Sequence, residues 1–411
     1  MELTSRTNQG VSNQLSSEIY WCRVSVHILY YWINMDFIDP TPMRPVDAVK
    51  FLSFLDLSPV LAVLEQFYCE PWRSRHPPEA MVRLFALYKL RRYRFLTELW
   101  RRLDKKTVKL LGFKWKPSYK TVWHFLNKRV EPEGLEAIHA ALLEAVNQAL
   151  TAQGIHLGER VAGDATPVQA KLADKEAAYN GYYKKRCYLV HRLVSYETNL
   201  TLEWLVTPGN VDEGQLMMPL LAKALFDGIM PKEAVFDNGY ASYWNYEIPN
   251  LLGIKLLIGF RRRAKLNWRG KPKTLKFRYR KMVKAGKLGA QKLEELGMHP
   301  DPDRNSLEEV LCALAIAGQH EYVGAYYRNQ SLTEFRRDRR SWLGCYVPLR
   351  SVVEGCHGHQ KDWLDLDNLK VKGLRRARLH VALCMLSEAA VAYDRVQHGV
   401  VKALTSQAFI R

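Results

Sequence analysis

Acidic residues are scarce in two parts of this 411-residue chain. Residues 71–130 contain 17 Lys and Arg but 3 Asp and Glu, and residues 261–290 contain 13 Lys and Arg and no acid. The whole chain has 61 Lys and Arg against 42 Asp and Glu, a formal net charge of +19, so the remaining residues are mildly acidic. Such concentrated positive charge predicts polyanionic partners at two separate places.

Long apolar runs are also missing. The most apolar N-terminal stretch, Ile19 to Phe37, is interrupted by Arg23, His27 and Asn34. It therefore offers no clean apolar span of the length that a transmembrane helix needs. The same stretch lacks the charged start and the small-residue cleavage site of a signal peptide. We expect a cytoplasmic protein with no membrane partner.

Cysteine is too sparse and too scattered for a disulfide framework. The seven cysteines are odd in number and show no Cys-x-x-Cys spacing, which favours a reducing compartment. Cys356, His357 and His359 are close in sequence, but no second ligand pair with zinc-finger spacing accompanies them. No Gly-rich phosphate loop with its lysine occurs either, so we expect no nucleotide cofactor.

Residues 1–155 predict an all-helical domain. Leu135, Ile138, Leu142 and Val146 recur at three- and four-residue spacing, as on one face of an amphipathic helix. In the basic block 71–130, Lys and Arg lie between such apolar positions, and Ser118 is a plausible N-cap. This pattern favours DNA binding over an ordinary solvated helix face, because acids are so few. Candidate DNA contacts are Arg91, Arg92 and Lys120.

After Gly154 the pattern changes to strands. Runs of β-branched and aromatic residues bounded by turn residues predict three successive strands, and then helices alternate with strands. Asp212 is a candidate cap for the first of these helices. This order is typical of an RNase H-like mixed sheet, so we predict an α/β domain over residues 156–411. The predicted strands are 160–168, 187–196, 200–207, 234–236 and 254–260, with helices after Asp212 and over 243–252.

The second basic block lies in a predicted insertion, residues 261–317, within that domain. Aromatic residues are interspersed with its positive charges, namely Trp268, Phe277 and Tyr279. Such rings can stack on nucleic-acid bases, although a flexible basic loop with incidental aromatics would have the same composition. The candidate DNA contacts here are Arg261, Arg262, Arg263, Lys265 and Trp268.

Three acids have unusual settings. Asp164 lies in the middle of the first predicted strand, and Asp237 ends the fourth. A carboxylate within an apolar strand is costly to bury unless it is paired or binds a metal, although Asp237, before Asn-Gly, also fits a simple turn. Glu354 shares one helix face with Arg350 and Lys361, a spacing that also fits a surface salt-bridge ladder. Asp365 and Asp367 are weaker candidates than Glu354, because they lack this Arg and Lys framing.

Asp164, Asp237 and Glu354, in this order and setting, resemble the DDE triad of insertion-sequence transposases. Arg350-x3-Glu354-x6-Lys361 matches the spacing of the class with a Tyr–Arg–Glu–Lys signature around the glutamate. The segment from Asp237 to Tyr240, and the turn at residues 208–212, are similar to the family as well. The resemblance covers most of residues 76–395.

The resemblance implies a prokaryotic, nucleoid-associated enzyme that acts on double-stranded DNA. Asp164, Asp237 and Glu354 would be catalytic and would hold two Mg²⁺ ions, or Mn²⁺ in their place, about 4 Å apart. Arg350 and Lys361 would face the DNA. Tyr346 would do the same, although three residues separate it from Arg350 where the signature has two.

The resemblance also implies a transposition cycle on terminal inverted repeats and target DNA. Because two bound ends must meet, a homodimer is expected in the synaptic complex. Two alternatives stay open. One is a catalytically inactive, transposase-derived DNA-binding regulator, which the intact acidic triad disfavours. The other is an RNase H-like metal nuclease without strand transfer.

Overall fold

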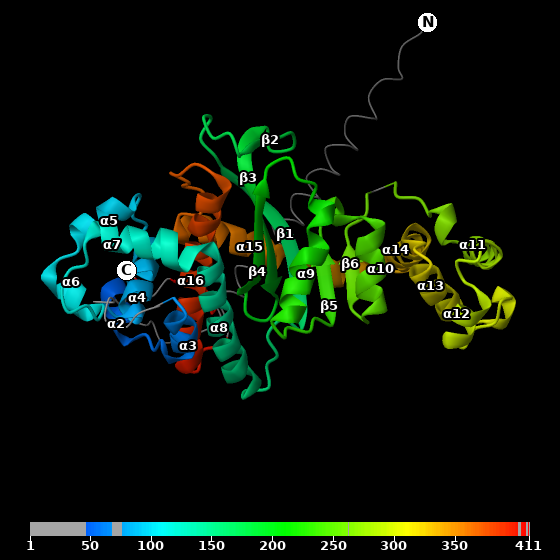
Figure 1. Cartoon of the computed structure of the whole chain (residues 1–411), viewed down its shortest axis with the longest axis horizontal. Helices are drawn as coiled ribbons and strands as arrows, with labels where there is room; N and C mark the ends of the chain where they lie inside the picture. Colours follow the sequence, from blue (N-terminus) through cyan, green and yellow to red (C-terminus); the bar gives the residue numbers. More distant parts are fainter. Residues whose placement is uncertain (1–46, 68–75, 262, 402–403, 408–409, 411) are drawn as a thin grey trace, which may run out of the picture. The chain divides into compact units, whose positions relative to one another are not determined.

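The computed structural model describes residues 47–67, 76–261, 263–401, 404–407 and 410. These residues belong to one compact unit, Val46–Arg411. None of the helices within them is both long and apolar enough to cross a membrane. Figure 1 labels the helices and strands of this unit.

The described residues before 155 form helices, as predicted. Ser118 caps α7, because its Oγ accepts a hydrogen bond of 3.0 Å from the backbone N of Thr121. The predicted apolar face of α8 is fully buried. The helices are α2 (Ala48–Phe54), α3 (Leu61–Glu65), α4 (Pro78–Leu90), α5 (Leu96–Arg102), α6 (Lys105–Leu110), α7 (Tyr119–His124) and α8 (Glu131–Thr151), with a 3-10 turn at Ser58–Val60 and a π-helical turn at Phe125–Val130.

The C-terminal helix α16 (Leu374–Gln397) joins these helices to the rest of the unit. It is buried over most of its length and packs against both α4 and α8. It also contacts strands β3 and β4 of the sheet. The domain boundary near residue 155 therefore stays a prediction, since the helices before it share their core with the end of the chain.

The predicted strands are all present and form one mixed sheet. Its order is β4-β3-β1-β5-β6, with β4, β3 and β1 antiparallel and with β1, β5 and β6 parallel. An additional short strand, β2, pairs with the start of β3. The bounds are β1 (Arg160–Gln169), β2 (Ala178–Asn180), β3 (Lys185–Ser195), β4 (Thr201–Pro208), β5 (Glu233–Phe236) and β6 (Lys255–Ile258).

Helices cover both faces of this sheet. Val161 of β1 belongs to the main core, whereas its neighbour Ala162 packs with Val352 and Val353 of α15 (Arg339–Leu364). Successive strand residues point to opposite faces, so α15 covers the face that Asp164 shares with Ala162. Figure 1 shows α9 (Met217–Phe226) in front of the sheet and α15 behind it.

Two local predictions need correction. Asp212 does not cap the helix that follows it: its side chain accepts from Gly214 N in a 3-10 turn at Glu213–Gln215, and α9 starts after that turn. From the sequence, Pro348 also reads as the residue before the helix of Glu354, but it lies inside that helix, because α15 begins at Arg339. A proline inside a helix removes one backbone hydrogen bond, and α15 tolerates this within a long packed segment.

The predicted insertion is helical rather than a flexible loop, so that alternative is wrong. It has its own core, to which Leu275, Tyr279 and Leu314 contribute. Tyr279 is fully buried there, which corrects its interpretation as a stacking residue, whereas Trp268 and Phe277 are exposed. The elements are α11 (Pro272–Lys284), α12 (Ala290–Glu295) and α13 (Leu307–Ile316), with 3-10 turns at Trp268–Gly270 and Pro302–Arg304.

Close backbone packing attaches this insertion to the sheet. The next helix, α14 (His320–Arg337), crosses α10 (Tyr243–Leu251), which connects β5 to β6. A Cβ placed on Gly324 of α14 would lie 2.1 Å from the carbonyl oxygen of Tyr243. Glycine is therefore required there, because a backbone neighbour cannot give way to a side chain.

Candidate active site

Three sequence-predicted carboxylates come together at one edge of the sheet. Asp164 lies in the middle of β1, and Asp237 directly follows β5. The two strands are parallel and Gly163 is the register partner of Phe236, so the two aspartates are neighbours across the sheet. Glu354 approaches the same place from α15, which packs on β1 and β5.

Arg350 connects all three carboxylates. Its Nη1 lies 2.7 Å from Asp164 Oδ2, and its Nη2 lies 3.4 Å from both Asp237 Oδ2 and Glu354 Oε1. The exposed side-chain fraction rises from 13% at Asp164 to 44% at Asp237 and 60% at Glu354. The cluster therefore has a buried end on β1 and opens to solvent along α15.

Burial and neighbouring charges shift the pKa values of Asp164 and Arg350. Burial raises the pKa of Asp164, and the nearby Arg350 guanidinium opposes that shift. Burial by itself lowers the pKa of Arg350, but Asp164, Asp237 and Glu354 outweigh it and raise the pKa above its ordinary value. Arg350 is thus a permanent positive charge that favours the ionised form of Asp164, although burial outweighs it and the Asp164 pKa stays above its ordinary value.

A fourth acid, Glu213, belongs to this region and was not among the predicted site residues. Burial, followed by the charges of Asp164, Asp237 and Asp212, raises the pKa of Glu213 to about 7. A Cβ on Gly239 would lie 2.6 Å from Glu213 Oε2, which shows how closely this carboxylate approaches the segment after β5.

One sequence signal points to Glu213. Because β4 is antiparallel to β3, it runs in the direction of β1, and the loop after Pro208 reaches the same sheet edge as Asp237. Polar side chains in loops that follow such strands gather at one edge.

His357 reaches the buried end of the cluster. Its Nε2 lies 4.0 Å from Asp164 Oδ2, and its Nδ1 contacts the guanidinium of Arg192. Arg192 lies on β3, is fully buried and is the register partner of Asp164 on β1. Burial, with Arg192 next to it, lowers the pKa of His357 well below its ordinary value, so the ring is neutral at pH 7.

His359 and His380 do not join the carboxylates. His359 stacks on Trp363, and His380 contacts Lys89 and the carbonyl oxygen of Leu366. Within the described residues, no three His, Cys, Asp or Glu side chains stand close enough to hold a metal ion between them. Arg350 occupies the space among the carboxylates instead.

Tyr346 and Lys361, both predicted to face DNA, make contacts within the protein. The hydroxyl of Tyr346 donates to the carbonyl oxygen of Phe236 at 3.4 Å, and its ring stacks on Trp342. The Nζ of Lys361 pairs with Asp367 Oδ2 at 3.5 Å. Asp367 is therefore the partner of Lys361 rather than a member of the carboxylate cluster.

Two of the predicted contacts of the insertion, Lys265 and Trp268, line an open cavity of about 810 Å³. It is lined by Trp244, Lys265, Trp268 and Arg328, among others. The ring of Trp268 is 57% exposed. Arg261 and Arg263 are exposed just before this cavity in sequence, and Arg262 lies outside the described residues.

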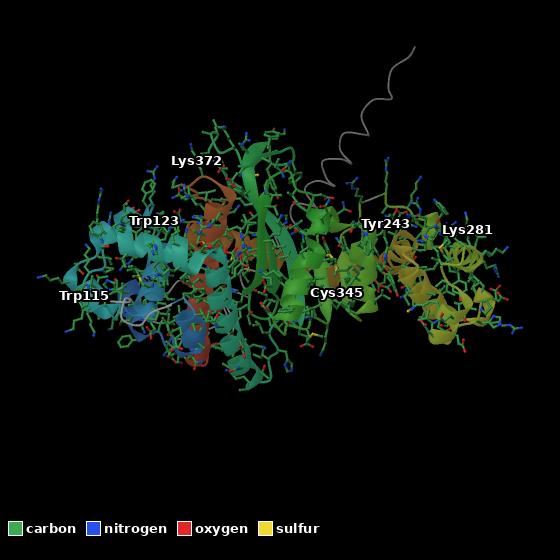
Figure 2. The ribbon with its side chains drawn as sticks, viewed as in Figure 1. Trp115, Trp123, Tyr243, Lys281, Cys345 and Lys372 are labelled. Carbon is green, nitrogen blue, oxygen red and sulfur yellow. The ribbon has the colours of Figure 1, made fainter. Side chains whose placement is uncertain are left out.

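Of the three predicted DNA contacts in the helical part, Arg91 and Arg92 lie next to acids of the protein. Arg91 forms an ion pair with Asp47, and Arg92 Nη2 lies 3.9 Å from Asp365 Oδ1. Lys120 is exposed on α7. Figure 2 shows Trp115 and Trp123 on the same helical part, where they are 49% and 38% exposed.

Among curated proteins, none matches the chain. Among protein families, one does. Residues 156–387, which contain the whole carboxylate cluster, match the family model described as the transposase DDE domain. This match covers more than half of the chain and confirms the resemblance to insertion-sequence DDE transposases. The chain belongs to the transposase DDE domain family.

Proposed function

We propose that this protein binds the terminal inverted repeats of an insertion sequence, cleaves the DNA at their ends and joins those ends to target DNA. The main support is that three carboxylates meet at the guanidinium of Arg350. Asp164 comes from β1, Asp237 from the residue after β5, and Glu354 from α15. The order β4-β3-β1-β5-β6, antiparallel and then parallel, supports an RNase H-like catalytic domain.

The donor set suits divalent metal ions in its chemistry. Asp164, Asp237 and Glu354 offer hard carboxylate oxygens, which Mg²⁺ and Mn²⁺ prefer. One guanidinium balances these three charges, and Glu213 adds a fourth acid nearby, so the site carries excess negative charge. Bound at these carboxylates, two Mg²⁺ ions would neutralise charge on the phosphate and activate the attacking oxygen.

The reaction consists of two phosphoryl displacements. In the first, a water oxygen bonds to the phosphorus at the element end, the P–O3′ bond breaks, and a free 3′-hydroxyl and a 5′-phosphate result. In the second, that 3′-oxygen bonds to a phosphorus of the target strand, whose own P–O3′ bond breaks. Both displacements use the same carboxylates, so loss of Asp164 removes both.

Other side chains serve this site without reacting. Arg350 holds Asp164 and Asp237 in place, and the same guanidinium suits a DNA phosphate when DNA enters the open side near Glu354. His357 and Arg192 support Asp164 from its buried end. The basic block 71–130 holds the inverted repeat, and the exposed cations near Trp268 hold DNA closer to the site.

Two such chains act together, because the two ends of an element must be joined in one complex. We therefore propose a homodimer on DNA. Strand transfer with ends that have already been cut separates this function from that of a plain nuclease: joined products are expected, whereas a nuclease would give none.

The decisive variant is Asp164→Asn. We expect it to abolish Mg²⁺-dependent nicking of DNA that carries the element's ends, while binding of the same DNA persists. Asp362→Asn changes an exposed carboxylate further along α15 and is the matched control, which should cut as the wild type does. Wild-type cutting by Asp164→Asn would refute the assignment of the site.

A further inference from the structure

The hairpin formed by residues 171–186, between β1 and β3, exposes large apolar side chains. Leu172 is 90% exposed, Tyr182 is 86% exposed and Tyr179 is 62% exposed. The short strand β2 and the turn after it carry the two tyrosines. Figure 1 shows β2 and the adjoining end of β3 beside each other at the top of the view. Exposed apolar groups collected on one projecting element indicate a binding surface.

The acids of this hairpin are engaged in hydrogen bonds, whereas three of its lysines are exposed. Its two acids both contact the start of α16: Asp174 is buried and accepts hydrogen bonds of 2.9 Å from Tyr188 Oη and from Gly373 N, and Glu176, which is exposed, accepts one of 2.8 Å from Leu374 N. Both acids thereby stabilise the start of α16, where a helix favours negative charge. The cations remain outside, with Lys171, Lys175 and Lys184 exposed.

The shape of the hairpin is set by its own hydrogen bonds. The Oδ1 of Asn180 accepts from the backbone N of Tyr182 and of Tyr183, both at 2.9 Å, and its Nδ2 donates to the carbonyl oxygen of Gly209 at 2.6 Å. Arg186 Nε also donates to the carbonyl oxygen of Ala177 at 2.9 Å. A preformed surface loses little conformational entropy on binding.

The hairpin also stands next to the carboxylate cluster. Tyr183 Oη donates at 3.4 Å to the carbonyl oxygen of Ala165, the residue after Asp164. Burial, and then the charges of Glu213 and Asp164, raise the pKa of Tyr183, which places this side chain within the field of the site. The hairpin begins where β1 ends, and β1 is parallel to β5, so it extends from the sheet edge of Asp237.

We propose that hairpin 171–186 grips unpaired DNA beside the cleaved bond, with Tyr179 and Tyr182 stacking on bases and with the exposed lysines on phosphates. This inference rests on the proposed function of the carboxylate site. DNA fits better than a protein partner, because the outward charge is positive and the neighbouring site acts on phosphodiesters. Base stacking on aromatic rings tolerates any sequence.

The test uses the full chain without divalent metal, so that no cleavage occurs. The probes are a 40-base-pair duplex of random sequence and the same duplex with a ten-nucleotide single-stranded extension. Tyr179→Ala with Tyr182→Ala should weaken binding of the extended probe about tenfold and that of the plain duplex much less. The matched control replaces Phe226 and Met230, which are 94% and 71% exposed on and after α9, by alanine.

A charge variant provides a second readout. Lys171→Gln, Lys175→Gln and Lys184→Gln together should lower the salt dependence of binding by about 2–3 released ions. If the wild type binds and both hairpin variants bind equally well, the hairpin is not a DNA contact, and the proposed function is untouched. The inference would likewise be overturned if the tyrosine variant lost self-association but kept its DNA affinity. If the hairpin variants lose binding, and the wild type does not cleave DNA that carries the element's ends in Mg²⁺, the hairpin is a DNA contact but the proposed enzyme function is refuted.

Discussion

Arg350 Nη1 lies 2.7 Å from Asp164 Oδ2, an ion pair that joins α15 to the middle of β1. Both side chains are mostly buried, with exposed fractions of 20% and 13%. The carboxylate that is most costly to bury thus has its own counter-ion within the chain. Arg350 is at the same time a positioning residue for the site and a structural contact between helix and sheet.

We predict that Arg350→Ala destabilises the metal-free protein by about 2 kcal/mol, because it leaves Asp164 buried beside Asp237 without a partner. Urea unfolding at neutral pH measures this change. In the double variant with Asp164→Asn, most of the loss should be recovered, since the unpaired charge is gone. Equal losses in the single and double variants would mean that the ion pair does not account for the effect.

We also predict that two buried histidines make the protein sensitive to mild acid. Burial, and then the charge of Lys223, lowers the pKa of His139 to about 3, and burial lowers that of His191 to about 4. The unfolded chain takes up these protons below about pH 6.5, but the folded protein does not. The contribution of these two histidines to stability should therefore fall as pH decreases from about 6.5 to 4, whereas Glu213, with its raised pKa, contributes in the opposite direction.

His139→Phe isolates one of these protons. His139 is on α8, and its ring packs edge-on against Trp204 of β4, so Phe preserves the contact. The variant should reduce the pH slope of the unfolding free energy by about 1.4 kcal/mol per pH unit in that window. The exposed His156→Phe is the control. An unchanged slope in His139→Phe would show that this ring is protonated in the folded protein.

A third prediction separates two cations of the helical part. Lys120 is exposed on α7, whereas Arg91 is already paired with Asp47. Lys120→Gln should reduce the slope of log affinity against log salt by about 1, and Arg91→Gln should reduce it less. Binding of a duplex at several salt concentrations measures both slopes. A flat salt response of the wild type would contradict the role of the whole basic block.

Much of the fold was predictable because its signals are local. Runs of β-branched and aromatic residues bounded by turn residues predicted the first three main strands, short apolar runs predicted the other two, and the apolar spacing of α8 predicted its buried face. Local signals failed where a contact from elsewhere decided the outcome. Tyr279 appeared as a stacking ring in sequence, but helices α11 and α13 bury it between them.

The candidate site was predictable to a lesser degree. Asp164 and Asp237 were singled out because they interrupt or end apolar strands. The spacing of Arg350 and Glu354 predicted that they share one helix face. It did not predict that the Arg350 side chain contacts both aspartates of the sheet. Glu213 reaches the site from the loop after β4, and only its place behind a strand indicates it in the sequence. His357 reaches the site from the buried face of α15, a position that no short-range pattern marks.

The sequence by itself determined the two basic blocks, the strand order along the chain and the carboxylates that interrupt or follow the strands. These properties depend on residue type and on spacing over a few residues. The tertiary structure decided which charges meet: Arg350 joins the carboxylates, Asp174 and Glu176 accept hydrogen bonds from the start of α16, and Lys171, Lys175 and Lys184 of hairpin 171–186 are exposed. Ion pairs between distant residues follow from packing, because burial penalises any charge that lacks a partner.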